Sequence, residues 1–116
     1  MLDLKDHFIQ ALKTQPKFSE AHLQLALLYK EEGDDKNTIK HFESAISADL
    51  EEAERLEEKG DELLKNLQFQ NAKDQFMKSQ EKKIHCAEVY FQQSNYYIVQ
   101  GQKKIAQSAL KNCIKM

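Results

Sequence analysis

The chain has 116 residues, of which 41% are hydrophobic and 31% are charged, with one proline and three glycines. This length suits a single domain, and the composition is typical of a compact helical protein and excludes an intrinsically disordered one. The formal net charge of −2 argues against nucleic acid as a bulk electrostatic partner, and no apolar run reaches the length that membrane insertion requires.

Proline, glycine and polar turn residues divide the first half of the chain into predicted helices. The first helix is expected over residues 2–14, because Pro16 disfavours a helical conformation in the residue before it. A second helix begins at Ser19, a good N-cap residue, and ends near Gly33. Its partner is expected over residues 35–48, and residues 49–52 are expected to connect it to the next hairpin.

The second half repeats this organisation. A third hairpin is predicted to turn at residues 66–68, and a last hairpin, residues 85–115, is predicted to turn at residues 100–102. The turn at residues 66–68 has no glycine, although glycine is the residue that ends helices most easily. A longer or strained helix is therefore expected before that turn.

Equivalent residues recur every 34 positions. Phe8, Phe42 and Phe76 are one such series, and Gly33 and Gly101 are two periods apart. A fixed period of this length, built from helix–turn–helix units, is typical of helical repeat proteins.

On these residues the chain resembles the tetratricopeptide repeat family, whose pattern is W-x2-L-G-x2-Y, then A-x3-F, then a terminal P. Residues 19–52, 53–86 and 87–116 each match part of the pattern, and residues 1–18 look like the second helix of an incomplete repeat. The matching residues are Leu25, Tyr29, Phe42 and Ala45, then Gly60, Ala72 and Phe76, then Tyr97 and Ala106. The resemblance implies an all-α fold of about seven helices, arranged as stacked hairpins in a right-handed superhelical solenoid.

The resemblance also implies a concave groove lined by the first helix of each hairpin, where the family holds extended peptides or helices. The candidate partner-binding residues are Leu23, Leu27, Glu57, Asp61, Leu64, Phe91, Asn95 and Ile98. This groove would be apolar at both ends and acidic in the middle, so the expected partner is a basic, amphipathic protein or peptide segment. The alternative is that Leu23, Leu27 and Phe91 belong to the core between repeats.

No residue pattern indicates catalysis, a cofactor or a metal. The four histidines, His7, His22, His41 and His85, are too widely spaced in the sequence to predict a shared metal site. No nucleophile–base–acid spacing and no glycine-rich phosphate loop is visible. Together with the groove that the resemblance to the tetratricopeptide repeat family implies, this predicts a non-catalytic scaffold for protein–protein interaction.

The two ends of the chain suggest alternative functions. Apolar residues there lack a neighbouring helix to cover them, so they are candidates for self-association: Leu4, Phe8, Leu110, Ile114 and Met116. The chain would then be a structural module that forms homo-oligomers, or the interaction part of a larger protein. The absence of a signal-peptide pattern at Met1 and of a paired spacing of the two cysteines predicts a cytoplasmic location.

Overall fold

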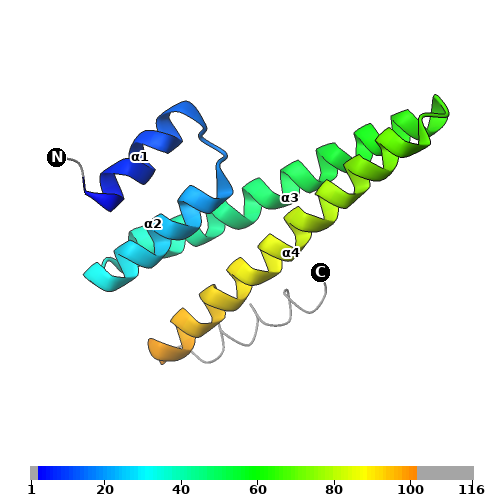
Figure 1. Cartoon of the computed structure of the whole chain (residues 1–116). Coiled ribbons are helices and arrows are strands. Elements are labelled where there is room, and N and C mark those ends of the chain that lie inside the picture. The colour runs from blue at the N-terminus through cyan, green and yellow to red at the C-terminus, as the bar shows by residue number, and fades with distance from the viewer. Residues whose placement is uncertain (1–2, 102–116) are drawn as a thin grey trace.

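A computed structural model describes residues 3–101 of the chain. Within them there are four α-helices and no strand: α1 (Leu4–Thr14), α2 (Ser19–Glu32), α3 (Asp35–Lys65) and α4 (Phe69–Val99). Figure 1 shows α3 and α4 as a long antiparallel pair, with α2 beside one end of the pair and α1 beside α2. The all-helical prediction is confirmed, and the helix predicted after residue 102 lies outside the described residues.

The predicted connection at residues 49–52 is wrong, because α3 continues through it, and the predicted start of a new hairpin at residue 85 is also wrong, because α4 continues through that position. The cause is the distribution of proline. Pro16 separates α1 from α2, but the equivalent positions one and two repeat periods further on are Leu50 and Ile84. Neither residue removes a backbone donor or clashes with the preceding turn, so nothing stops the helix there. Two helices of 31 residues each therefore replace four of the shorter predicted ones.

The buried face of α3 runs through the predicted connection without interruption. Its buried residues Phe42, Ile46, Asp49, Ala53 and Leu56 follow one another at intervals of three or four positions, which is the spacing of one helical face. Burial of this continuous face against α4 and α2 stabilises the helix across residues 49–52. A loop at that place would expose the middle of the stripe.

The predicted repeat period does appear in the turns. Gly33, Leu67 and Gly101 have φ angles of 78°, 60° and 74°, and Leu67 is the only non-glycine residue with positive φ between residues 3 and 101. The backbone N–H of Leu67 donates to the Leu64 carbonyl at 3.0 Å, and that of Gly33 donates to the Lys30 carbonyl at 3.1 Å. The helix before this turn is longer than its neighbours in the first half of the chain, as expected from the missing glycine. The strain itself lies in the turn, because Leu67 adopts a left-handed conformation that favours glycine.

The main core lies where α2 meets α3 and α4. It contains aliphatic, aromatic and small residues from all three helices: Leu23, Ala26, Phe42, Ala45, Ile46, Cys86, Val89, Tyr96 and Tyr97. Further along the pair, among the four described helices, α3 and α4 contact each other. A Cβ atom added to Gly60 would lie 2.8 Å from Cζ of Phe76, so glycine is required there for the aromatic ring to approach the α3 backbone.

Helix α1 is held less firmly than the others. None of its residues is buried, and among the helices described between residues 3 and 101 it contacts α2 alone extensively. Lys5 fixes it by an ion pair to Glu32 at 3.0 Å and by a position 4.9 Å above the centre of the Tyr29 ring. Of the residues predicted for self-association, Leu4 is 57% exposed and Phe8 is half-buried, whereas Leu110, Ile114 and Met116 lie outside the described residues.

In the described part of the chain, no helix combines the length and the apolarity needed to cross a bilayer. Although α3 and α4 are long enough, they carry charged side chains throughout.

Candidate functional site

The eight residues predicted for partner binding do not share one surface. Leu23 is only 5% exposed and belongs to the core, and Leu27 packs against that core, so for these two the alternative assignment to the core is correct. Leu64 lies near the end of α3 and Ile98 near the end of α4, at opposite ends of the antiparallel pair. With a rise of about 1.5 Å per residue, these two ends are about 40 Å apart.

The acidic middle of the predicted groove is only partly available. The Glu57 carboxylate accepts a hydrogen bond from Ser79 Oγ at 3.1 Å and pairs with Lys83 Nζ at 2.5 Å. The hydrogen bonds from Lys83 and Ser79 lower the pKa of Glu57, so it stays ionised and engaged within the molecule. Asp61 and Leu64 are exposed.

The structure does bring together the last three candidates. Phe91, Asn95 and Ile98 are exposed on the outer side of α4 at the i, i+4, i+7 spacing of one helical face. The apolar residues extend towards the start of the helix as Met77 and Ile84, each seven positions from the next. We name Met77, Ile84, Phe91 and Ile98 the α4 stripe.

The α4 stripe is exposed along its whole length. Its four side chains are 56%, 68%, 53% and 50% exposed in chain order. Asp74, Glu81 and Glu88 lie three positions before Met77, Ile84 and Phe91 respectively and form an acidic flank on the helix surface. An apolar line with an acidic border is therefore displayed over about 32 Å of helix.

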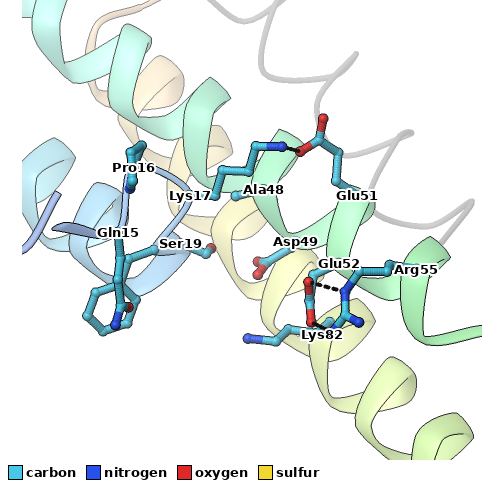
Figure 2. A pocket seen from close by; sticks show the side chains of 11 residues that line it. Gln15, Pro16, Lys17, Ser19, Ala48, Asp49, Glu51, Glu52, Arg55 and Lys82 are labelled. Carbon is cyan, nitrogen blue, oxygen red and sulfur yellow. Dashed lines mark hydrogen bonds and ion pairs between the residues drawn. The ribbon is translucent and has the colours of Figure 1, made fainter. Parts of the chain in front are cut away.

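A second feature is a cleft beside the connection between α1 and α2 (Figure 2). It has a volume of about 700 Å³, within the range of small-molecule and side-chain sites. The walls come from this connection, the middle of α3 and one residue of α4. Its lining residues are Gln15, Pro16, Lys17, Phe18, Ser19, Ala48, Asp49, Glu51, Glu52, Arg55 and Lys82. We name it the Asp49 cleft.

A polar network joins α2, α3 and α4 behind this cleft. Asp49 is only 1% exposed, and its Oδ2 lies 2.5 Å from Nδ1 of His85. The other ring nitrogen, Nε2, lies 2.8 Å from Oε2 of Glu20. Burial opposes a charge on His85, but the hydrogen bonds to Asp49 and Glu20 outweigh it and raise its pKa. The network therefore favours an imidazolium between two carboxylates.

This network does not have the geometry of a nucleophile with its base. Ser19 Oγ lies 3.2 Å from His85 Nδ1, but that nitrogen is already held by Asp49, and Glu20 holds the second one. The Ser19 hydroxyl also donates to the Ala45 carbonyl at 3.0 Å. In a catalytic triad one histidine nitrogen faces the serine and the other faces the acid. Here both nitrogens face carboxylates, so the network links α2, α3 and α4 through ion pairs.

Two histidines that the sequence analysis treated as separate also meet. Nδ1 of His22 lies 2.9 Å from Nδ1 of His41, and His22 Nε2 donates to the Pro16 carbonyl at 2.8 Å. The His41 ring stacks on Tyr29 with an angle of 6° between the planes. Burial, followed by the nearby charges of His22 and Lys40, lowers the pKa of His41 to about 4. Among the described residues, no group of three or more His, Cys, Asp or Glu side chains is placed to hold a metal.

Sequence reasoning missed Asp49 and its partners because it placed residues 49–52 in a connection. One pattern could have revealed Asp49: it occupies a position of the apolar stripe of α3 between Ile46 and Ala53. An acidic residue in such a stripe is almost never buried without a partner. Nothing in the sequence identifies His85 and Glu20 as those partners.

A search against protein-family models returned no match, and a search of curated proteins also returned none.

Proposed function

We propose that this chain is a non-catalytic scaffold that binds a basic, amphipathic helical segment of a partner protein along the α4 stripe. The observation that carries the proposal is the alignment of four exposed apolar side chains at intervals of seven positions on one face of α4. Exposed apolar surface of this kind usually marks an interaction site. A partner helix would place its own apolar face on the stripe, which is a common mode of peptide recognition.

The charges beside the stripe support a basic partner. The acidic flank, Asp74, Glu81 and Glu88, runs parallel to the apolar residues along α4. Lysine or arginine residues at the border of a partner helix would meet these carboxylates. Such exposed pairs add orientation and a faster association rate more than affinity.

We also propose that the chain is a member of the tetratricopeptide repeat family. The same proposal includes a solenoid arrangement of its helices and a cytoplasmic location. Support for the family comes from the positive φ angles of Gly33, Leu67 and Gly101, which follow one another at the repeat period of the sequence. The described helices differ from the family pattern, because α3 and α4 continue where the family has connections.

A second proposed function is self-assembly into homo-oligomers, or a role as the interaction part of a larger protein. It is favoured by α1, which buries none of its residues and leaves Leu4 exposed. A second copy or a further helix could cover that surface.

The first proposal is tested with a designed peptide about six helical turns long, which matches the length of the stripe. It forms an amphipathic helix with leucines on one face and lysines at its borders. Binding is measured by fluorescence anisotropy on the full chain at two salt concentrations. We expect a dissociation constant in the micromolar range that weakens with salt, because the acidic flank contributes. A peptide with glutamates in place of the lysines is expected to bind at least tenfold more weakly.

Variants of the chain locate the binding site. The double substitution Phe91→Ser with Ile98→Ser removes half of the α4 stripe and is expected to weaken the lysine peptide more than tenfold. Val99→Ser is the matched control, because Val99 is 81% exposed and apolar but does not belong to the stripe. Equal binding by the double variant, or tighter binding of the glutamate peptide, would contradict the proposal.

A further inference from the structure

We infer that the Asp49 cleft is a binding site for a guanidinium or ammonium group. Asp49 lines the cleft, is 1% exposed and uses only Oδ2 to contact His85. Its Oδ1 is buried and has no hydrogen-bond partner among the described residues. Buried carboxylate oxygens in proteins are normally paired, so the unpaired oxygen of a residue that lines a cleft points to a donor from outside the molecule.

The charges around Asp49 favour a cation. Two carboxylates, Asp49 and Glu20, share the single imidazolium of His85, so these three side chains together carry one net negative charge. Two of the cations of the cleft wall are engaged elsewhere (Figure 2). Arg55 is paired with Glu52 through two hydrogen bonds, and Lys17 pairs with Glu51 at 2.8 Å.

Lys82 is the remaining cation of the cleft. Within residues 3–101 its ammonium lies within 4.0 Å of no carboxylate, although it lines the same cleft as Asp49. Its charge opposes the entry of another cation by direct repulsion. Removal of this charge is therefore expected to strengthen the binding of a cationic ligand in the cleft. A ligand bound elsewhere on the surface would not respond to this change.

The shape of the cleft suits an arginine side chain. The apolar surfaces of Pro16 and Phe18 form part of the wall and would cover the methylene groups of the ligand. Phe18 is 42% exposed at the mouth, where its ring could stack on a planar guanidinium. Because Oδ1 itself is buried, the ligand reaches it by displacing side chains of the wall, of which Lys17 and Phe18 are exposed.

This site lies apart from the α4 stripe, and the inference does not depend on the function proposed for the stripe. Lys82 is five positions from Met77 along α4, which places the two side chains on different sides of the helix. The probes are small blocked amino acids, so they test the cleft alone. Loss of binding here would leave the peptide result on the stripe unchanged.

The test is a titration of the isotope-labelled full chain with N-acetylarginine methylamide, followed by NMR of the backbone amides. We expect saturable shifts at Ser19, Asp49 and their neighbours with a millimolar dissociation constant. The matched probe is N-acetylcitrulline methylamide, which has nearly the same shape without the charge and should bind at least tenfold more weakly. Agmatine distinguishes a free cationic metabolite from a peptide-borne side chain: tighter binding of agmatine would assign the site to the free cation.

Two variants assign the effect to the cleft. Asp49→Asn keeps the shape and is expected to weaken arginine binding at least tenfold, whereas Lys82→Met is expected to strengthen it about threefold. Glu58→Gln removes an exposed carboxylate outside the cleft and should leave binding unchanged. Equal shifts with arginine and citrulline, absence of saturable shifts, or weaker binding by Lys82→Met would overturn the inference. If Asp49→Asn fails to fold, the probe comparison and Lys82→Met still decide it.

Discussion

Leu67 occupies a position that the other two turns of the chain give to glycine. Its φ angle is 60° and it is 72% exposed, so its side chain gains little from packing and stays in a strained backbone conformation. We predict that Leu67→Gly raises the free energy of unfolding by about 0.5–1 kcal/mol, because relief of the left-handed strain exceeds the entropy that glycine gains in the unfolded chain. Urea denaturation measures the difference.

The matched control for Leu67 is Gly33, whose φ of 78° places it in the same region and whose added Cβ would meet nothing within 4 Å. Gly33→Ala should therefore lower the free energy of unfolding by about 1 kcal/mol through backbone strain alone. A destabilising effect of Leu67→Gly would show that the Leu67 side chain contributes more than its exposure indicates.

The half-buried histidines His41 and His85 are expected to make stability depend on pH in opposite directions. The folded pKa of His41 is lowered from 6.5 to about 4, so its contribution is present above pH 6.5 and is lost as the pH falls towards 4. At about 1.4 kcal/mol per pKa unit this change has an upper bound of about 3 kcal/mol, which solvent screening of the partly exposed ring reduces. The folded pKa of His85 is raised, so its contribution is present below pH 6.5 and is lost as the pH rises through the raised value.

Denaturation curves between pH 4 and pH 9 separate these two contributions. His41→Phe keeps an aromatic ring on Tyr29 and should remove most of the loss of stability on the acidic side. His85→Gln should flatten the alkaline side while lowering stability throughout, because it leaves Asp49 without a charged partner. A wild-type curve that is flat between pH 4 and pH 6.5 would contradict the environment described for His41.

At the scale of elements, the unbroken α3 is the main departure from the pattern read in the sequence. Leu50 lies in the middle of α3 and is 41% exposed, at the position where the first turn has Pro16. We predict that Leu50→Pro costs about 3 kcal/mol or more, since it removes a helical hydrogen bond and clashes with the preceding turn. Leu50→Ala is the control and should cost less than about 1 kcal/mol. Similar values for both variants would indicate a connection at residues 49–52 after all.

The packing of the two repeat phenylalanines differs between the two ends of the hairpin. Phe42 is fully buried in the core, whereas Phe76 is half-buried against Gly60. Phe42→Ala should cost about 3–5 kcal/mol, and Phe76→Ala about half as much because part of its ring already faces solvent. Thermal and chemical denaturation give both values. A loss below about 1 kcal/mol at both positions would contradict the repeat phasing of the chain.

The sequence contained enough information to predict helices, turns and their period, but not the joining of neighbouring helices. Local residues decide where a helix ends, because Pro16 and Gly33 affect only the backbone within a few residues of themselves. Whether α3 passes through residues 49–52 depends on burial against α4, which is a contact between distant segments. The regular spacing of Phe42, Ile46, Asp49 and Ala53 indicates a continuous buried face on α3. The family pattern nevertheless predicted a connection at residues 49–52.

At the scale of the whole molecule, the candidate binding surface was predictable only in part. Phe91, Asn95 and Ile98 lie on one exposed face of α4, which their spacing within a single helix made predictable. Leu23 could not be assigned from spacing, since its burial depends on where α2 meets α3 and α4. The Asp49 cleft combines residues from three helices and the α1–α2 connection, so no local pattern could reveal it.

The α4 stripe exists as a continuous surface only if α4 is unbroken from Met77 to Ile98. The most direct test is a distance between nitroxide labels at Lys73 and Asn95, both exposed on α4, in a chain carrying Cys86→Ala and Cys113→Ser. Pulsed electron paramagnetic resonance should give a single narrow distribution near about 33 Å between the labelled backbone positions, which is the length of about six turns of helix. If the chain instead turned back near residues 84–86, the two labels would lie on adjacent helices about 10 Å apart. That shorter distance would contradict both the fold and the proposed binding surface.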